Sequence, residues 1–451
     1  MKKNILFLLS FQFITLYSFA QWTAIGNGFD GDVNAVCVFN NALYAAGNFT
    51  HDGTSATTLN HIAKWNGSAW VAVGTGVNAN VTSMAVFNSE LYVGGDFTTA
   101  GTASALKIAK WSGTTWYSVD SGFNNTVRCL YVWNNTLYAG GTFNASGSSS
   151  IIRIAKFTGT EWQTAGPAPG PVNAIVGYNN ELYIGGYWFP PYVCKFNSAN
   201  NAWDDLTGGS IAPDDEVTSL AFFRKQNSSN IVLWIGGKFN MLSSPHLCTW
   251  SSTGGFTTSF NTFNQTAGAN VNTLLSTSNY LFAGGGFSAT VMGNSFSKLG
   301  KYNGSSIWDS VGVSFNNDVN ALTSFNGNLV AGGKFTSLGS AGNANRIAWR
   351  NLSIGIDEVD ENILVRDFYP NPLLTSAVLK IQTKSSFHQP ALNIFDLDGR
   401  KVNPVTKIIS LNPVNHEVEY KIERSGLPAG IYIYEVSDLE KNIAAGKFIV
   451  E

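Results

Sequence analysis

Charged residues are scarce in this 451-residue sequence, and the two signs almost cancel. Lysine and arginine number 27, aspartate and glutamate number 29, and together they make up only 12% of the chain. Proteins that bind nucleic acid need an excess of positive charge, so this composition argues against a nucleic-acid partner. Asparagine, serine, threonine and glycine supply the polar surface instead, which is typical of an exported, β-rich protein.

The motifs of common catalytic and metal sites are also missing. The sequence contains no Gly-x-Ser-x-Gly elbow, His-Glu-x-x-His helix, P-loop or dinucleotide fingerprint. No cysteine or histidine spacing resembles a zinc site. The acidic runs Asp204-Asp205 and Asp214-Asp215-Glu216 have no positioned acid beside them, and we expect them on solvated loops. We predict no catalytic residue, metal or cofactor, although an enzyme is not excluded at this point.

Apolar runs of membrane-spanning length are absent. Residues 1–20 combine Lys2 and Lys3, an apolar stretch and a small-residue site ending at Ala20, the pattern of a signal peptide cleaved before Gln21. The apolar stretch is too short and too polar to span a bilayer well. No cysteine lies near the cleavage site, which argues against a lipoprotein. We therefore predict no transmembrane segment after signal cleavage.

What the sequence does contain is a repeat with a period of 45 to 54 residues. Its clearest motif is an apolar strand that ends in Gly-Gly, often followed by x-Phe. The motif is found at Leu43–Phe49, Leu91–Phe97, Leu137–Phe143, Leu182–Gly186, Leu233–Phe239, Leu281–Gly285 and Leu329–Phe335. A period of this size indicates stacked or radial units.

Each unit contains four strand-like words. The first begins with Val, the second is the Gly-Gly strand, the third resembles Ile62–Trp65, and the fourth resembles Trp70–Gly74. The first word begins at Val33, Val81, Val127, Val172, Val217, Val271 and Val319. Asn-Asn, Asn-Gly and similar pairs join the strands, as tight hairpins require. Four antiparallel strands per period describe a β-propeller blade.

The two ends of the repeat region are complementary. The segment that begins at Trp22 is a fourth-strand word without a preceding blade, and the seventh unit ends at Arg350 without a fourth strand. The N-terminal strand is therefore predicted to complete the last blade, which removes an exposed sheet edge. The fold class we predict is all-β, with a seven-bladed β-propeller over residues 21–352.

Recurrence in every unit gives most of the unusual residues a structural explanation. Glycine at the end of the second strand permits close approach by a neighbouring blade. The recurring aromatics are predicted to pack between blades, with sugar stacking as the less favoured alternative. Cys194 and Cys248 hold positions that other units give to alanine, and Cys37 and Cys129 lie in units that are not adjacent. We therefore expect four free thiols.

The Gly-Gly strand ending, with Tyr before it and Trp later, resembles kelch-type propeller repeats. It is also similar to the Gly-Gly-x-Phe repeats of bacterial surface propellers. The resemblance covers about residues 22 to 352 and implies a propeller. Such propellers serve binding proteins and some enzymes, so the resemblance does not settle the function.

The sequence pattern changes after the repeat. Residues 353–365 read as an acidic linker, and 366–451 contain several short alternating strands, which predicts a small C-terminal β-sandwich. This region closely resembles the type A C-terminal sorting domain of type IX secretion, also called the Por secretion system. The residues that carry the resemblance lie in four words, and they are Pro370, Asn371, Pro372, Asp396, Gly399, Gly430, Tyr432 and Lys447. The terminal Glu451 departs from the basic residue that often ends such tails.

The resemblance implies that type IX secretion machinery is a partner. It also implies passage across the inner membrane of a Gram-negative bacterium, recognition at the outer membrane, removal of the tail, and display or release. An ordinary accessory sandwich is the alternative.

One set of residues is a candidate ligand site. The position just before the third strand is basic in six of the seven units, with Tyr192 in the other. The six candidates are His61, Lys107, Arg153, His246, Lys298 and Arg346. On the same face, nearer the axis, we expect the acids Asp30, Asp32, Glu216 and Asp318. Such a ring would suit an anionic glycan, although basic residues at strand ends usually only face solvent.

The function predicted from these features is a secreted or cell-surface binding or adhesion protein that contacts glycans or surface proteins. Two alternatives are a polysaccharide-acting hydrolase or lyase and a structural spacer in a surface assembly. The enzyme would need converging carboxylates or histidines in the central funnel, and the sequence contains no convincing set.

Overall fold

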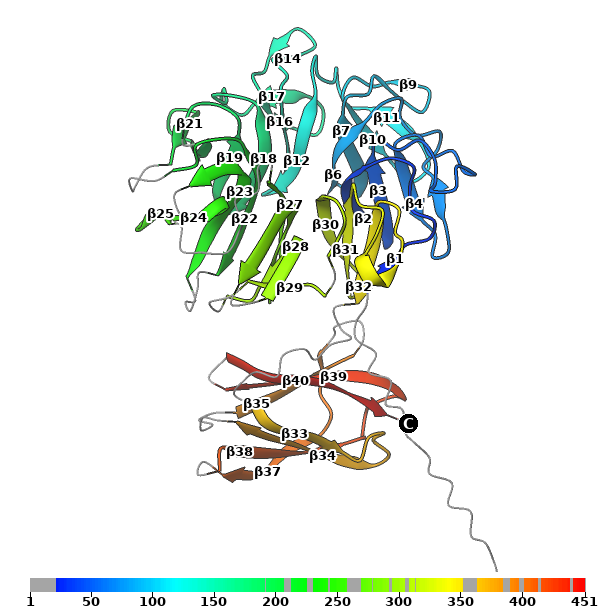
Figure 1. The fold of residues 1–451 in the computed structure, drawn as a ribbon, viewed down its shortest axis with the longest axis vertical. Coiled ribbons are helices and arrows are strands. Elements are labelled where there is room, and N and C mark those ends of the chain that lie inside the picture. Colours follow the sequence, from blue (N-terminus) through cyan, green and yellow to red (C-terminus); the bar gives the residue numbers. More distant parts are fainter. Residues whose placement is uncertain are drawn as a thin grey trace, which may run out of the picture. The chain divides into compact units, whose positions relative to one another are not determined.

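The computed structural model describes residues 22–450, except 191, 207–211, 225–229, 242–243, 258–268, 278, 292–293, 305–307, 313, 352–362, 384–389, 397–400, 413–414 and 439–440. The predicted signal peptide lies outside the described residues. The chain divides into two compact units, Met1–Leu352 and Ser353–Glu451 (Figure 1). The described residues form β-strands and one short 3-10 helix, Gly339–Ala341.

The described part of the first unit contains seven four-stranded antiparallel sheets and two short two-stranded hairpins. We call each four-stranded sheet a blade and number the blades in the chain order of the strands that open them. Blades one to three consist of β2 (Val33–Phe39), β3 (Ala42–Gly47), β4 (Ile62–Trp65) and β5 (Trp70–Ala72); β6 (Val81–Phe87), β7 (Glu90–Gly95), β10 (Ile108–Trp111) and β11 (Trp116–Ser118); and β12 (Val127–Trp133), β13 (Thr136–Gly141), β16 (Ile154–Phe157) and β17 (Trp162–Thr164). Blades four and five consist of β18 (Val172–Tyr178), β19 (Glu181–Gly186), β20 (Val193–Asn197) and β21 (Ala202–Asp205); and β22 (Val217–Arg224), β23 (Ile231–Met241), β24 (Ser244–Ser251) and β25 (Gly255–Thr257). Blades six and seven consist of β26 (Val271–Ser276), β27 (Leu281–Val291), β28 (Asn294–Tyr302) and β29 (Trp308–Ser310); and β30 (Val319–Phe325), β31 (Asn328–Gly333), β32 (Ile347–Asn351) and β1 (Thr23–Ala24).

The blades form a closed ring. The first strands contact one another in chain order, β2 with β6 and so on to β30, which contacts β2 again. The outer strand of blade seven is β1, because Thr23 pairs with Trp349 and Ala24 with Ala348. The propeller architecture and the use of the N-terminal strand in the last sheet therefore agree with the expectation from the sequence.

The first glycine of each Gly-Gly pair makes room for the next blade. A Cβ at Gly94 would lie 2.5 Å from Cγ1 of Val127, the residue that opens β12. Gly332 stands in the same relation to Val33, so blade seven packs on blade one as the others pack on their successors. Blade one has Ala46 at this position, which means that one methyl group can be accommodated there.

The second glycine meets a harder obstacle within its own blade. A Cβ there would lie 1.9–2.2 Å from the backbone carbonyl oxygen of the residue preceding the first strand. The glycines are Gly47, Gly95, Gly141, Gly186, Gly237, Gly285 and Gly333. The first two strands of every blade also change register just after the opening valine, as at Val33/Ala35. The carbonyl is backbone and cannot swing away, which explains why this position is glycine in every blade.

Tryptophans of the fourth strands tie the outer edges of neighbouring blades together. The indole N–H of Trp70 donates to the carbonyl of Ile25 at 2.8 Å, and that of Trp116 donates to Val73 at 2.8 Å. Trp22 is fully buried and donates to Val311 at 2.6 Å. The N-terminal segment therefore joins blade six to blade one at the rim. These contacts lie between blades, which agrees with the packing role predicted for the tryptophans.

The four cysteines are unpaired. Cys194 and Cys248 are fully buried at their alanine positions, and Cys37 and Cys129 are half-buried. Burial raises the pKa of Cys37 to about 11 and that of Cys129 to about 12. These thiols stay protonated at neutral pH, so they act as small apolar side chains.

The second unit is a sandwich of two four-stranded sheets around one apolar core. One sheet has the order β33 (Ile363–Tyr369), β34 (Ser376–Thr383), β38 (Glu417–Glu423) and β37 (Thr406–Asn412). The other has the order β36 (Lys401–Val402), β35 (Pro390–Phe395), β39 (Gly430–Asp438) and β40 (Lys441–Val450). The predicted linker, 353–365, is too long at its C-terminal end, because β33 already pairs with β34 at Ile363 and Val365.

The two glycines of one pair should differ in their tolerance of alanine. Gly95→Ala places a methyl group against the carbonyl of Asn80, and we expect it to lower the free energy of unfolding by about 2–3 kcal/mol. Gly94→Ala faces side-chain atoms of Val127 and Leu130 rather than backbone, and we expect a cost of about 1 kcal/mol. Urea denaturation of both variants measures the difference. Equal costs, or a larger cost at Gly94, would contradict the assignment of the two roles.

Candidate functional site

The connections between second and third strands gather on one end of the propeller. Two of them form short hairpins, β8 (Thr99–Ala100) with β9 (Ala103–Ser104) and β14 (Ala145–Ser146) with β15 (Ser149–Ser150). The labels β9 and β14 mark these hairpins in blades two and three in Figure 1. The residues that precede each first strand lie beside these loops, because their carbonyls contact the second glycines. This end, which we call the loop face, holds the candidate residues.

Some acids on the loop face hold the loops in place. Oδ1 of Asp30 accepts hydrogen bonds from the backbone N–H groups of Thr50 at 2.8 Å and His51 at 3.0 Å. Asn78, Asn124 and Asn316 make the same pair of bonds in other blades. Burial alone would raise the pKa of Asp30, but hydrogen bonds from His51 and Thr50 outweigh it, and the pKa lies below its usual value. Asp30 therefore holds the loop at Thr50 and His51 in place.

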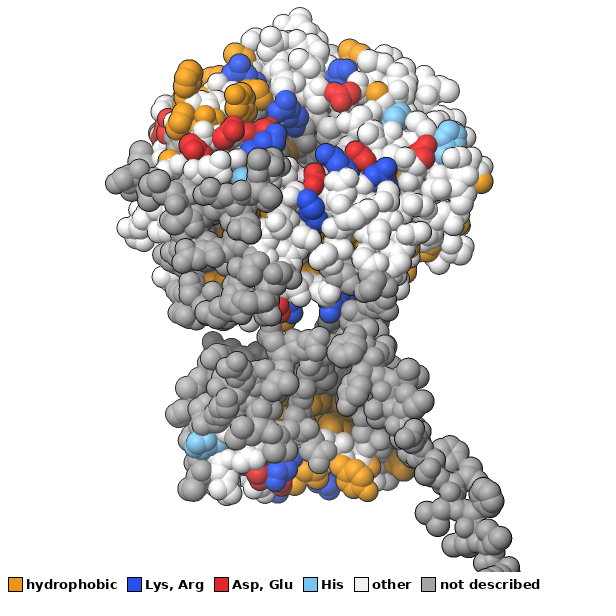
Figure 2. Space-filling view, in the orientation of Figure 1, with side chains coloured by type: hydrophobic (Ala, Val, Ile, Leu, Met, Phe, Trp, Pro, Cys, Tyr) orange, Lys and Arg blue, Asp and Glu red, His pale blue; other side chains and the backbone are white. Residues whose placement is uncertain are grey.

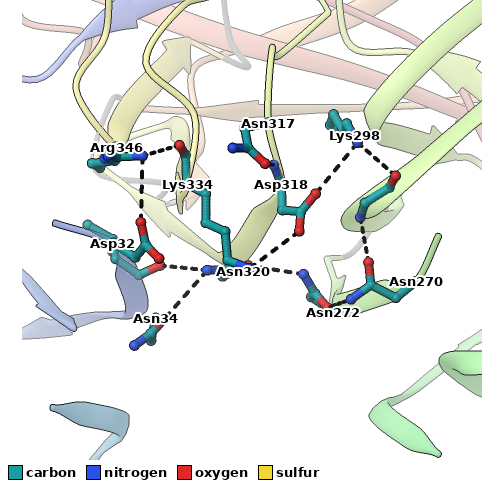
Figure 3. Close-up of polar contacts among 12 residues, drawn as sticks. Asp32, Asn34, Asn270, Asn272, Lys298, Asn317, Asp318, Asn320, Lys334 and Arg346 are labelled. Carbon is teal, nitrogen blue, oxygen red and sulfur yellow. Dashed lines mark hydrogen bonds and ion pairs between the residues drawn. The ribbon is translucent and has the colours of Figure 1, made fainter. Parts of the chain in front are cut away.

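The other predicted acids lie in ion pairs around the mouth of the central channel (Figure 3). Asp318 lies between two lysines, with Oδ1 3.5 Å from Nζ of Lys298 and Oδ2 3.6 Å from Nζ of Lys334. Asp32 lies 3.5 Å from Nη1 of Arg346. These pairs join blades six, seven and one. Figure 2 shows basic and acidic side chains interspersed across this part of the surface.

Glu216 has the same role on the other side of the mouth. Its carboxylate lies 2.6 Å from Nζ of Lys238 and 3.9 Å from Nη1 of Arg128, and it accepts a hydrogen bond from Asn173 at 2.9 Å. The expectation of a solvated loop holds for Asp214 and Asp215, which are exposed, but Glu216 is half-buried in ion pairs. Asp214 also accepts a hydrogen bond from the backbone N–H of Asn240 at 2.7 Å. Lys238 and Asn240 each lie more than 20 residues from their partner in the chain, beyond the reach of local patterns.

Amides and hydroxyls complete the ring inside the mouth. Asn34 donates to Asn80 at 2.8 Å, Asn272 donates to Asn320 at 3.0 Å, and Asn320 donates to Asn34 at 3.4 Å. Thr82 and Thr218 occupy the same strand position and donate to backbone carbonyls of the next blade. The channel wall is therefore polar at this level and carries one charged side chain, Arg128 of blade three, which donates to Asn173 at 2.7 Å. Much of the hydrogen-bonding capacity of the wall is used between blades.

The six predicted ligand residues share one backbone geometry. Each has a left-handed backbone, with φ between 65° and 70°, and Tyr192 has φ 62° at the same position. The backbone N–H of Lys107 donates to Phe97, and its carbonyl accepts from Gly95, which closes the loop onto the second strand. Comparable bonds close the loops at His61, Arg153 and Arg346. The shared position is thus set by loop closure.

The side chains at these positions turn back to the protein. Nζ of Lys107 donates to the carbonyl of Asp96 at 2.7 Å, and Nζ of Lys298 donates to that of Gly286 at 2.7 Å. Arg153 donates to Pro169 at 2.9 Å, and Arg346 donates to Lys334. His61 is half-buried and His246 is buried. Sequence reasoning missed Lys238 and Lys334, whose side chains are 50% and 45% exposed, more than Lys298 or Arg346 at 23% each.

The residues of the predicted sorting motif lie in the second unit, and two of them contact its own strands. Oδ1 of Asn371, between Pro370 and Pro372, accepts from the backbone N–H of Ile449 in β40 at 2.9 Å. Tyr432 is buried, its ring stacks on Phe448 at 5.6 Å, and its hydroxyl donates to Pro428 at 2.9 Å. Asp396 is half-buried and Gly430 pairs with Val450. Gly399 and the side chain of Lys447 lie outside the described residues.

In the described part of the chain, no group of three or more His, Cys, Asp or Glu side chains is placed to hold a metal ion. Within the same residues, no helix is long and apolar enough to cross a membrane.

Two family models match parts of the chain. Residues 367–451 match the family model of the secretion system C-terminal sorting domain, and residues 68–188 match that of the Rax2 C-terminal beta propeller domain. No curated protein matches the chain significantly. Among solved structures, the crystal structure of dimeric latent PorU from Porphyromonas gingivalis aligns with 95% of this chain and 33% of that chain, at 15% identity and a TM-score of 0.17. The chain spans about a third of that structure's length, and so low a TM-score carries no argument.

These matches define a class of protein, an exported β-propeller with a sorting tail. The type IX secretion machinery is the partner that the tail implies, and the destination is the cell surface or the extracellular space. Propeller and sorting tail both agree with the prediction from the sequence. The kelch resemblance stays a prediction.

The buried His246 should make the propeller sensitive to acid. Burial lowers the pKa of His246 below its usual value of 6.5, despite opposing contributions from the Lys238 backbone and Asp214. The unfolded chain therefore takes up the proton first as pH falls, and stability present above about pH 6.5 is lost below it. His246→Asn suits the left-handed backbone and carries no titrating group.

When the pH is lowered from 7.5 to 5, we expect the denaturation midpoint of the wild type to fall more than that of His246→Asn. His416→Asn is the matched control, because His416 also has a left-handed backbone, with φ 55°. The His416 substitution lies in the second unit, so the pH dependence of propeller unfolding should match that of the wild type. Parallel curves for wild type and His246→Asn at both pH values would contradict the prediction.

Proposed function

We propose that this is an exported, non-enzymatic binding or adhesion protein whose propeller contacts glycans or surface proteins at the loop face. The observation that carries the proposal is the concentration of charged and amide side chains around the mouth of the channel, on the end that bears the long loops. Recognition residues are commonly placed on loops held by a rigid scaffold. The export route supports a ligand outside the cell.

Ion pairing at the mouth favours binding over catalysis. Asp32, Glu216 and Asp318 each face at least one lysine or arginine within 4 Å. A glycoside hydrolase needs one carboxyl group that donates a proton and a second that acts as a base or nucleophile. Neutralised carboxylates shared between blades instead make a stable polar surface. A polysaccharide-acting enzyme and a structural spacer are the other outcomes of the binding experiments.

An anionic ligand should depend on the exposed lysines of the mouth. We expect Lys238→Gln/Lys334→Gln to weaken binding to heparin, used as a polyanionic glycan probe, by about tenfold, which corresponds to about 1.4 kcal/mol. Added salt should weaken wild-type binding as well, since exposed charges are screened. Lys195→Gln, on the outer part of blade four, is the control, with a side chain 35% exposed.

Three results separate the candidates. Salt-sensitive binding that is lost only in the double variant supports the basic part of the mouth as the contact. Binding of neutral glycans or surface proteins alone keeps the proposal but removes the anionic ligand. Release of products from a polysaccharide would make the protein an enzyme, and failure to bind any glycan or surface protein would favour the spacer.

The second unit should act as an export address that the propeller does not need for folding. Its core is formed by its own residues, from Leu373 to Val450. We propose that it is removed after outer-membrane recognition, and that the mature chain also lacks residues 1–20. Truncation after residue 362, expressed in a bacterium with type IX secretion, should leave a folded propeller in the periplasm.

Fractionation and protease resistance measure this outcome, with the full chain as the control. Normal delivery of the truncated chain to the surface or medium would contradict the address. Degradation in the periplasm without accumulation would instead contradict the independence of the propeller.

A further inference from the structure

Blade four departs from the other blades at the loop face. The residue after the Gly-Gly pair is small, polar or charged in the other six blades, but is Tyr187 in blade four. The residue before the third strand is His, Lys or Arg elsewhere, but is Tyr192 here. The spacing from the second glycine, Gly186, to the first residue of the third-strand motif, Val193, is also the shortest of the seven blades, and this segment contains Trp188, Phe189 and two prolines.

The side chains of this connection are divided between anchoring and exposure. Trp188 is half-buried, takes the place of the buried phenylalanine of other blades, and packs on the blade-four core. Tyr187 is 55% exposed and Phe189 is 90% exposed, the highest value for a large apolar side chain among the described residues. Burial in the core cannot account for these two rings. Exposed aromatic clusters of this kind commonly mark a site of interaction.

The exposed rings stand on a braced backbone. The N–H of Tyr187 donates to Pro171 at 3.1 Å, the N–H of Gly186 donates to Tyr192 at 3.2 Å, and the N–H of Tyr192 donates to Phe189 at 3.4 Å. The rings of Tyr187 and Tyr192 lie side by side, with centroids 6.3 Å apart and planes 32° apart. The result is a fixed aromatic surface, which costs little ordering when a flat ligand binds.

Acidic groups border this surface. Asp214 and Asp215, on the segment that leads into β22, are both exposed. Tyr192 and Ala212, two residues before Asp214, pack against the same apolar cluster. Burial and the charges of Asp215 and Asp214 raise the pKa of Tyr192. Figure 2 shows hydrophobic side chains beside acidic ones at the upper left of the propeller. Carboxylates accept hydrogen bonds from hydroxyl groups but repel anions.

We propose that Tyr187, Phe189 and Tyr192 form a stacking site for a neutral polysaccharide, with Asp214 and Asp215 as acceptors for its hydroxyl groups. A pyranose ring has an apolar face of C–H groups that matches an aromatic ring and a rim of hydroxyls that matches carboxylates. Aromatic lining with a few polar groups is the usual composition of a ligand site. The proposal rests on the proposed function, and it assigns the ligand class on one sector of the loop face.

Titration calorimetry of the full chain with cellohexaose, laminarihexaose and mannohexaose tests the site, with hexagalacturonate as an acidic comparison. We expect at least one neutral hexasaccharide to bind more tightly than hexagalacturonate, and Tyr187→Ala/Phe189→Ala to lose at least about tenfold in affinity. Tyr117→Ala, which removes an aromatic ring 48% exposed on β11, is the matched control and should bind as the wild type. Unchanged thermal melting of the double variant verifies that it is folded.

Three results would overturn the stacking site: no binding of any neutral hexasaccharide, equal binding by the double variant, or preference for hexagalacturonate. The proposed function fails separately, because it requires loss of all glycan and surface-protein binding. Heparin or surface-protein capture that the double variant retains would leave the binding function in place while removing the aromatic site.

Discussion

The propeller depends on one close contact, repeated in every blade. The second glycine of the Gly-Gly pair lies against the carbonyl that precedes the first strand, with no room for a side chain between them. This contact brings the end of the second strand next to the start of the first, at the edge of the channel. Consequently the residues that flank both points converge, and Asp318 reaches Lys334 because each directly precedes or follows that contact.

The convergence also explains why the mouth is held together by polar groups from different blades. An ion pair between groups from different blades joins two sheets at the mouth while keeping both charges near water. Partly exposed pairs of this kind add little stability individually. Their effect is to hold the rim of the ring in one arrangement, and a rigid rim is a suitable base for loops and for the aromatic group of blade four.

The sequence predicted the blades well because their determinants are local. Gly-Gly endings, opening valines and Asn-containing turns each lie within one strand or hairpin, and Asn40, Asn41, Asn134 and Asn135 have the left-handed backbone expected of such turns. The contacts of Glu216 could not be predicted in the same way, because Lys238 and Arg128 lie on other strands and, for Arg128, on another blade. The sequence prediction started the second unit at residue 366, after the first residues of β33, because the recognisable motifs begin only beyond that point. The aromatic residues of blade four were visible in the sequence, but their exposure is a property of the folded loop.

The pairing of β1 with β32 gives the ring a seam made from both ends of its chain. A propeller built this way lacks a complete sheet in its last blade until Arg350 and the residues before it are available to the N-terminal strand. Pairing of Thr23 with Trp349 is a contact of very long range in sequence, and such contacts slow folding. During synthesis from the N-terminus, Thr23 and Ala24 must therefore remain without their strand partner until Ala348 and Trp349 have been made. Closure of the ring therefore requires that the whole length of the propeller sequence be present.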